Sequence, residues 1–226
     1  MSGEPGLGFE AVIFDLDGVL VDAEVWWDEI RIGFAERHGR PWTEADRAAT
    51  MGANSFGWST TMRDRLGLAD LPREEIEAEV VEAMVERYRA EGAPMITDAV
   101  ETVRRIADRV PVAVASSAHR DVIAAALESL GIVELFTAVV SADEVPVGKP
   151  APDVYLLAAT RIGIAPRACL VVEDSLNGVL SGRAAGMTVV LIPNEAIPPA
   201  PGAREAASAV LDRIGRLDID ALRRSG

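Results

Sequence analysis

The stretch AVIFDLDG at residues 11–18 places four apolar residues directly before two carboxylates and a glycine. A short apolar run with β-branched residues is typical of a strand buried in a parallel sheet. Similar runs recur at residues 112–115, 138–140, 169–172 and 188–192, and apolar residues at helical spacing fill most of the intervening sequence. This alternation predicts an α/β fold built on a doubly wound parallel sheet.

Polar side chains follow three of these runs at the point where each run ends. Asp15 and Asp17 follow the first, residues 116–117 are a Ser-Ser pair, and residues 173–174 are a Glu-Asp pair. Ligands of open α/β sheets bind outside the carboxyl ends of the strands. We therefore expect these distant polar residues to meet in one crevice.

Residues 23–92 have a different character, with long amphipathic stretches and no strand-like run. All four tryptophans fall in this segment, at Trp26, Trp27, Trp42 and Trp58. We interpret residues 23–92 as a helical cap inserted into an α/β catalytic core formed by residues 1–22 and 93–226. Four prolines between 193 and 202 predict a loop, and residues 203–214 are expected to form the last helix.

Composition indicates a folded enzyme-sized chain and argues against several classes of partner. The chain has 226 residues, 49% of them apolar, and a formal net charge of −14. Binding to nucleic acid or to an anionic membrane requires clustered positive charge, so we expect neither partner. A cytoplasmic monomer is the expectation. Cys169 is the only cysteine, and its apolar neighbours favour a buried, unreactive thiol.

The paired carboxylates suggest a metal site. Up to four carboxylates in one crevice repel one another unless a cation compensates them, and Mg²⁺ binds one or two carboxylates together with a phosphate oxygen. The alternative is that Asp15 and Asp17 only stabilise a turn before Gly18, because Asp-Gly is a common turn dipeptide.

Two further motifs suit a phosphate group. Ser116 and Ser117 precede a predicted helix, where hydroxyls and free backbone N–H groups form an anion site, although such a pair can equally be a helix cap. Lys149 lies in the loop GKPAPD, whose prolines restrict its backbone, although a loop lysine is often merely solvated. The combination of all four motifs favours a phosphate-binding site.

The motifs FDLDGVLVD at 14–22, ASS at 115–117, GKPAPD at 148–153 and VVEDSLNG at 171–178 resemble the four ordered motifs of the haloacid dehalogenase superfamily. They resemble in particular its phosphatase and β-phosphoglucomutase-like branch, in which a helical cap follows the first motif. This resemblance implies that Asp15 is a nucleophile that forms an aspartyl-phosphate and that Asp17 is the general acid and base. It also assigns phosphoryl binding to Ser116 and Lys149. The implied Mg²⁺ ligands are Asp15, the backbone carbonyl of Asp17, and Asp174, with Glu173 in or near the metal shell.

The second aspartate favours phosphate esters over halides, because a departing alkoxide needs a proton and a halide does not. The β-phosphoglucomutases carry a cap histidine and a cap arginine at the places where this chain has Trp27 and Ser55. We therefore predict a Mg²⁺-dependent phosphatase for a small phosphorylated metabolite, a sugar or polyol phosphate. A sugar phosphomutase and a non-catalytic phosphometabolite-binding regulator are the alternatives.

The cap is expected to select the substrate. Trp27, Trp58 and the loop residues Gly52, Asn54 and Ser55 are candidates to face the leaving group. The amide of Asn54 and the hydroxyl of Ser55 suit hydrogen bonds to a sugar or polyol. The alternative for each tryptophan is that it packs inside the core of the cap.

Overall fold

The computed structural model describes residues 9–194 and 197–224. Its centre is one six-stranded sheet, entirely parallel, with the strand order β3-β2-β1-β4-β5-β6. The strands are β1 (Ala11–Phe14), β2 (Val112–Ser116), β3 (Phe136–Ser141), β4 (Cys169–Glu173), β5 (Thr188–Leu191) and β6 (Ala209–Val210). The prediction of a parallel α/β sheet is confirmed.

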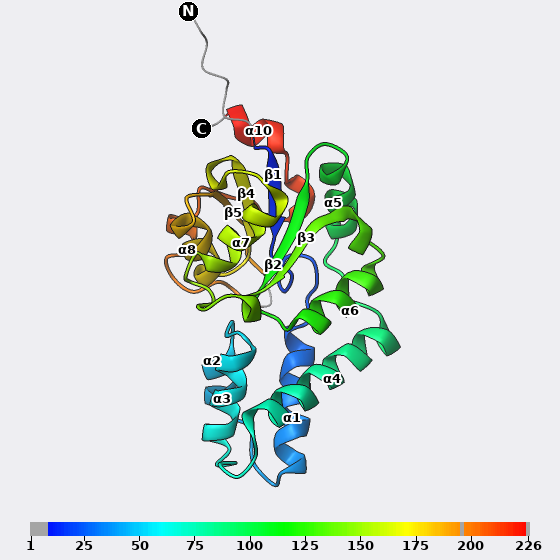
Figure 1. Ribbon diagram of the computed structural model, residues 1–226, viewed down its shortest axis with the longest axis vertical. Coiled ribbons are helices and arrows are strands. Elements are labelled where there is room, and N and C mark those ends of the chain that lie inside the picture. Colours follow the sequence, from blue (N-terminus) through cyan, green and yellow to red (C-terminus); the bar gives the residue numbers. More distant parts are fainter. Residues whose placement is uncertain (1–8, 195–196, 225–226) are drawn as a thin grey trace, which may run out of the picture.

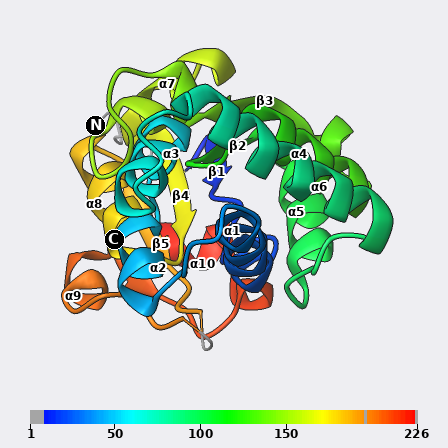
Figure 2. The same cartoon turned by 90° about the horizontal axis from the view of Figure 1, so that it is seen from below.

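Helices cover both faces of this sheet and also form a separate layer at one end of it (Figure 1). α5 and α6 pack on one face, and α7 and α8 pack on the other (Figure 2). The helices are α1 (Glu24–Arg37), α2 (Glu44–Thr50), α3 (Ser55–Arg65), α4 (Arg73–Glu91), α5 (Ala99–Ala107), α6 (Arg120–Leu130), α7 (Asp153–Ile162), α8 (Leu176–Ala184), α9 (Ala203–Ala206) and α10 (Ile219–Arg224).

The central strand β1 is buried on both sides. Val12 and Phe14 pack into the core beneath α5 and α6, whereas Ala11 and Ile13 pack into the core beneath α7 and α8. Successive side chains of a strand point to opposite faces, so a strand covered on both faces is apolar throughout. Phe14 pairs with Val114 of β2 and Val172 of β4, and the carboxyl ends of these three strands are therefore level.

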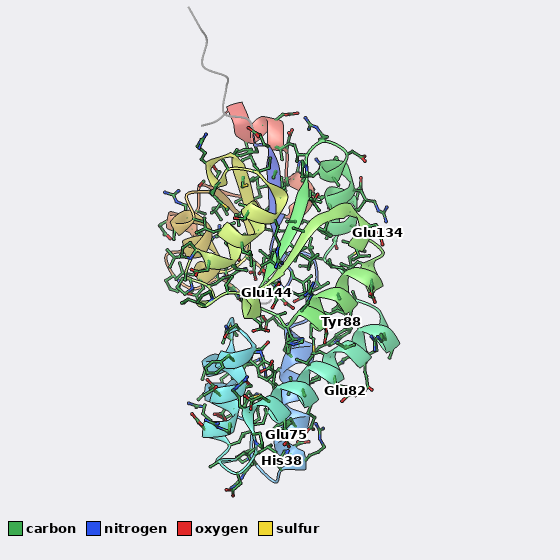
Figure 3. All side chains as sticks on the ribbon, in the orientation of Figure 1. His38, Glu75, Glu82, Tyr88, Glu134 and Glu144 are labelled. Atoms are coloured by element: carbon green, nitrogen blue, oxygen red, sulfur yellow. The ribbon has the colours of Figure 1, made fainter. Side chains whose placement is uncertain are left out.

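Helices α1 to α4 lie beyond the carboxyl ends of the strands (Figures 1 and 2). Two chain segments connect this layer to the sheet, and they lie side by side. Between them, the amide of Asp22 donates to the carbonyl of Pro94 at 2.8 Å, and the amide of Ile96 donates to the carbonyl of Leu20 at 3.1 Å. His38, at the end of α1, lies at the end of the layer farthest from the sheet (Figure 3). The layer therefore adjoins the strand ends through the start of α1 and not through its end.

The prediction of a last helix at residues 203–214 was wrong. A four-residue helix, α9, is followed by the two-residue strand β6, which extends the edge of the sheet. The amide of Ser208 donates to the carbonyl of Val189 at 2.8 Å, and that of Leu211 donates to Leu191 at 2.9 Å. The outer edge of β5 thus supplies hydrogen-bond partners for backbone groups that a helix would have paired within itself. The described part of the predicted loop at 193–202 is irregular, and residues 195 and 196 lie outside the description.

Two further expectations concern single features. Cys169 is buried in β4, and burial raises the pKa of its thiol to about 11, as expected for an unreactive core cysteine. Within the described ranges, no helix combines the length and the apolar character that crossing a bilayer requires.

Candidate active site

Lys149 and Asp15 form the centre of the site at the carboxyl end of β1. Lys149 is the only lysine in the sequence, and its side chain is 4% exposed. Its Nζ donates to Asp15 Oδ1 at 2.9 Å and to Glu173 Oε1 at 2.6 Å. The two carboxylates outweigh the effect of burial and raise the pKa of the Lys149 ammonium. One permanently charged cation therefore joins the first and last acidic motifs across more than a hundred residues of sequence.

Glu173 is held on both carboxylate oxygens. Besides Lys149, Oε1 accepts a hydrogen bond from the Tyr155 hydroxyl at 2.6 Å, and Oε2 accepts bonds from the amide and hydroxyl of Ser175. Burial opposes ionisation, but Lys149 and these donors outweigh it and lower the pKa of Glu173. A Cβ at Gly178 would lie 1.7 Å from Oε1, so the first turn of α8 has room for this carboxylate only with glycine there. Glu173 is therefore an oriented anion that fixes Lys149.

Asp17 lies nearer to the helical layer. The indole Nε1 of Trp27, in α1, lies 3.4 Å from Asp17 Oδ1 in hydrogen-bond geometry. Burial, reinforced by the charges of Glu24 and Asp15, raises the pKa of Asp17 to about 8. A carboxyl group that keeps its proton near neutral pH is suited to protonate a leaving group. For Asp15, burial raises the pKa to about 7 against the opposing charge of Lys149.

Asp15, Glu173 and Asp174 offer one oxygen each within 4.8 Å of one another. When all three are ionised, their charges exceed the single charge of Lys149 by two. Burial, followed by the charges of Glu173 and Asp15, raises the pKa of Asp174 well above its usual value. This set of hard oxygen donors with an excess of two charges fits Mg²⁺. Gly18 has a positive φ of 78°, and a Cβ there would lie 1.9 Å from Asp174 Oδ2, so this glycine permits the close approach.

Ser116 and Ser117 lie at the end of β2, beside β1, and both line the same cavity as Asp15 and Lys149. The Ser116 hydroxyl oxygen accepts a bond from the amide of Ala118 at 3.0 Å, which leaves its proton available for another acceptor. The structure thus brings together all the predicted core residues of the site.

The cavity between the strand ends and the helical layer has a volume of about 320 Å³. From the helical layer, Trp27, Gly52 and Trp58 line it, as do Glu24 and Arg31 of α1. The centroids of the Trp27 and Trp58 rings lie 6.3 Å apart. Trp27 and Trp58 are buried, as the packing alternative expects, and they also form one wall of the cavity.

Asn54 and Ser55 lie elsewhere, in contrast to the expectation that they face the leaving group. Asn54 Oδ1 caps α3 by accepting a bond from the amide of Gly57 at 3.0 Å. The buried hydroxyl of Ser55 donates to Asp143 Oδ2 at 2.6 Å, and its amide donates to Oδ1 at 3.0 Å. Asp143 precedes Glu144, which lies at the boundary between sheet and helical layer (Figure 3). These two residues therefore start a helix and connect the layers.

Sequence reasoning missed three residues of the site: Glu24, Arg31 and Tyr155. Glu24 and Arg31 lie three residues before and four residues after Trp27, so helical spacing places all three on one face of α1. That spacing was a usable signal once Trp27 was a candidate. Tyr155 carried no comparable signal, because its role depends on how α7 packs over the sheet and brings the hydroxyl to Glu173 at the end of β4.

The fold and the site together define a class of α/β proteins in which carboxylates and one buried lysine meet at the carboxyl ends of parallel strands. A family model described as haloacid dehalogenase-like hydrolase matches residues 9–186. The chain belongs to this family, as the four motifs indicated.

Individual relatives and structures extend this likeness. Fructose-1-phosphate phosphatase YqaB of Escherichia coli K12 is 34% identical over 184 residues, which cover 80% of this chain and 95% of that protein. Bifunctional riboflavin kinase/FMN phosphatase of Arabidopsis thaliana is 29% identical over 195 residues, covering 81% of this chain but 48% of that longer protein. The crystal structure of β-phosphoglucomutase from Clostridium difficile has the same fold, with a TM-score of 0.81, 18% identity and 96% coverage of both chains.

Proposed function

We propose that this chain is a Mg²⁺-dependent phosphatase that hydrolyses a small phosphorylated metabolite, a sugar or polyol phosphate, through an aspartyl-phosphate on Asp15. The observation that carries the proposal is the contact of Lys149 Nζ with Asp15 and Glu173, at 2.9 and 2.6 Å, beside Asp174. A cation fixed against a carboxylate allows that carboxylate to approach an anionic phosphate.

In the first step, an oxygen of Asp15 attacks phosphorus and the ester P–O bond breaks. The bonding pair leaves with the alkoxide oxygen, which takes the proton of Asp17. Ser116, Ser117 and Lys149 hold the non-bridging oxygens of the phosphoryl group. This division replaces one difficult hydrolysis by two displacements.

In the second step, water attacks the phosphorus of the aspartyl-phosphate and gives a proton to Asp17. The bond between phosphorus and Asp15 breaks, inorganic phosphate leaves, and both carboxyl groups return to their starting states. Asp15, the Asp17 carbonyl and Asp174 would hold Mg²⁺, with Glu173 beside them. Bound Mg²⁺ supplies positive charge against the transferring oxygens.

The helical layer supports a phosphatase over a mutase. Trp27 takes the place of the histidine that the mutases carry, and Ser55 is bonded to Asp143 and so offers nothing to a second phosphate. The cavity of about 320 Å³ suits a metabolite of sugar size. We further propose that residues 23–92 act as a cap that closes over the substrate, with the core formed by the remaining residues.

The test is release of phosphate from para-nitrophenyl phosphate with Mg²⁺ by the wild type, Asp15→Asn and Asp64→Asn. Asp64 is an exposed acid of α3 beside Arg63, so its variant is a matched control that retains activity. We expect Asp15→Asn to lose activity by at least about 1,000-fold, as for other covalent nucleophiles. Activity that survives Asp15→Asn would remove Asp15 as nucleophile. Wild-type inactivity on a broad panel of esters would favour a binding protein, and sugar phosphate isomerisation faster than phosphate release would favour a mutase.

A further inference from the structure

Arg31 is a buried cation in the wall of the cavity that the reaction proposed above does not use. The residue is 7% exposed and lies in α1, one turn beyond Trp27. Among the described residues it forms no ion pair, and its Nε has no hydrogen-bond partner. A buried charge without an ion pair is costly, and its place in the wall of a cavity points to an anion that enters the cavity.

Two aromatic rings flank the Arg31 guanidinium. Its central carbon lies 5.1 Å from the ring centroid of Trp27 and 5.6 Å from that of Trp58. Such cation–π contacts stabilise a guanidinium, but they do not satisfy its N–H donors. The rings therefore position the planar group and leave its donors for a ligand.

Three acidic groups lie close enough to act electrostatically on Arg31, and two of them have other hydrogen-bond or ion-pair partners. Asp28 accepts a hydrogen bond from Trp42 Nε1 at 3.1 Å and pairs with Arg47 at 3.6 Å, and the Trp27 indole donates to Asp17. Burial raises the pKa of Glu24, the third acid, against the opposing charge of Arg31. None of these carboxylates forms an ion pair with Arg31 within the described residues.

The charge balance favours a monoanion as the ligand. One guanidinium carries one positive charge, which a single negative charge on the ligand balances. A carboxylate presents two oxygens to the planar fork of an arginine with a single negative charge. A second phosphate presents up to two negative charges, of which one guanidinium balances only one.

We propose, on the basis of the phosphatase function above, that Arg31 binds a carboxylate of the leaving group, so that the preferred substrates are phosphorylated sugar acids or polyol acids. Trp27 contacts Asp17, and Arg31 follows one helical turn later, about 5.4 Å along α1. Long helical side chains lean toward the N-terminus of their helix, here toward Asp17. The carboxylate and the phosphate ester are therefore separated by a few carbon atoms.

The test compares pairs of esters that have the same number of carbon atoms and differ in one carboxylate. The pairs are 6-phosphogluconate with sorbitol 6-phosphate, and 3-phosphoglycerate with glycerol 1-phosphate. The wild type is expected to show a kcat/KM at least about 10-fold higher for the acid of at least one pair, the range for a hydrogen bond to a charged group. Fructose 1,6-bisphosphate serves as the second-phosphate probe, and its preference over both acids would overturn the carboxylate assignment.

The variants Arg31→Gln, Arg31→Lys and Arg37→Gln separate binding from packing. Arg37 is an exposed arginine of the same helix that pairs with Glu79, so Arg37→Gln is expected to keep the preference of the wild type. Arg31→Gln is expected to abolish the preference by lowering kcat/KM for the acids alone, and Arg31→Lys to restore part of it. An equal loss for acids and neutral esters would assign Arg31 a packing role and overturn the proposal.

Failure of this inference is distinguishable from failure of the phosphatase function. Hydrolysis of para-nitrophenyl phosphate by the wild type, without any preference for acids, overturns the role of Arg31 alone. Absence of hydrolysis of every ester overturns both. Thermal unfolding of Arg31→Gln checks that this variant is folded. If Arg31→Gln does not fold, an Arg31→Met variant, which also lacks the buried charge, provides the second test of the preference.

Discussion

Replacing Lys149 with methionine tests the electrostatic centre of the site. The Lys149 side chain is 4% exposed, and its two partners Asp15 and Glu173 are 11% and 0% exposed in their side chains. Methionine retains most of the side-chain volume but leaves two buried carboxylates without their cation. Removing one partner of a buried ion pair destabilises a protein by about 3–5 kcal/mol.

Urea unfolding followed by circular dichroism measures this change, with Mg²⁺ removed by a chelator. For a chain of this size the expected loss corresponds to a fall in Tm of roughly 6–20 °C, at about 2–4 °C per kcal/mol. The exposed pair between Arg37 and Glu79 supplies the control, because Arg37→Met is expected to change the free energy of unfolding by less than about 1 kcal/mol.

A second substitution identifies the cause of the loss. Glu173→Gln removes one of the uncompensated charges, so the double variant Lys149→Met/Glu173→Gln is expected to be more stable than Lys149→Met alone, by about 1–3 kcal/mol. Lowering the pH is expected to reduce the loss in Lys149→Met, since the carboxylates can then take up protons. A loss below about 1 kcal/mol, or no coupling between positions 149 and 173, would refute the view that Lys149 is a buried counter-ion.

Mg²⁺ is expected to raise the Tm of the wild type, by an amount equivalent to about 2.7 kcal/mol at one hundred times its Kd, and differential scanning calorimetry of Asp174→Asn is expected to show a smaller rise. The pKa of Asp17 is raised from 3.8 to about 8, so its proton stabilises the folded state below pH 4, and this contribution is lost as the pH rises through 8. Without metal, wild-type stability is therefore expected to fall relative to Asp17→Asn over that interval, and parallel urea midpoints would contradict the assignment. The variants Ser55→Ala and Asp143→Ala are expected to lower kcat/KM, and a double-mutant cycle to give a coupling of about 1–2 kcal/mol; additive effects would mean that their bond does not couple the helical layer to the sheet.

The strands were predictable because their burial on both faces leaves a direct trace in the sequence. Ala11 and Ile13 contact one core while Val12 and Phe14 contact the other, so no polar residue interrupts the run. The short strand β6 left no such trace. Its two residues pair with β5 through backbone bonds, and backbone pairing at a sheet edge places little demand on side-chain type.

The core of the site was predictable from order and position, because the ends of parallel strands must meet at one edge. The helical wall was harder to predict. Trp27 and Trp58 could be selected by type, but Ser55 was assigned to the substrate although its hydroxyl is bonded to Asp143 of the core. That contact joins positions 88 residues apart and depends on how the two layers sit together. Arg31 lacked a motif altogether, although its spacing from Trp27 was visible.

The most direct test of the central claim locates the phosphoryl group on the protein. In Asp17→Asn, para-nitrophenyl phosphate can still phosphorylate the enzyme, because its leaving group needs no proton, but hydrolysis lacks its base. We predict that an acid-quenched sample shows a peptide carrying one phosphoryl group on Asp15, and that Asp15→Asn/Asp17→Asn shows none. A phosphoryl group on Ser116 or Ser117, or an unmodified protein during continuing turnover, would contradict the account.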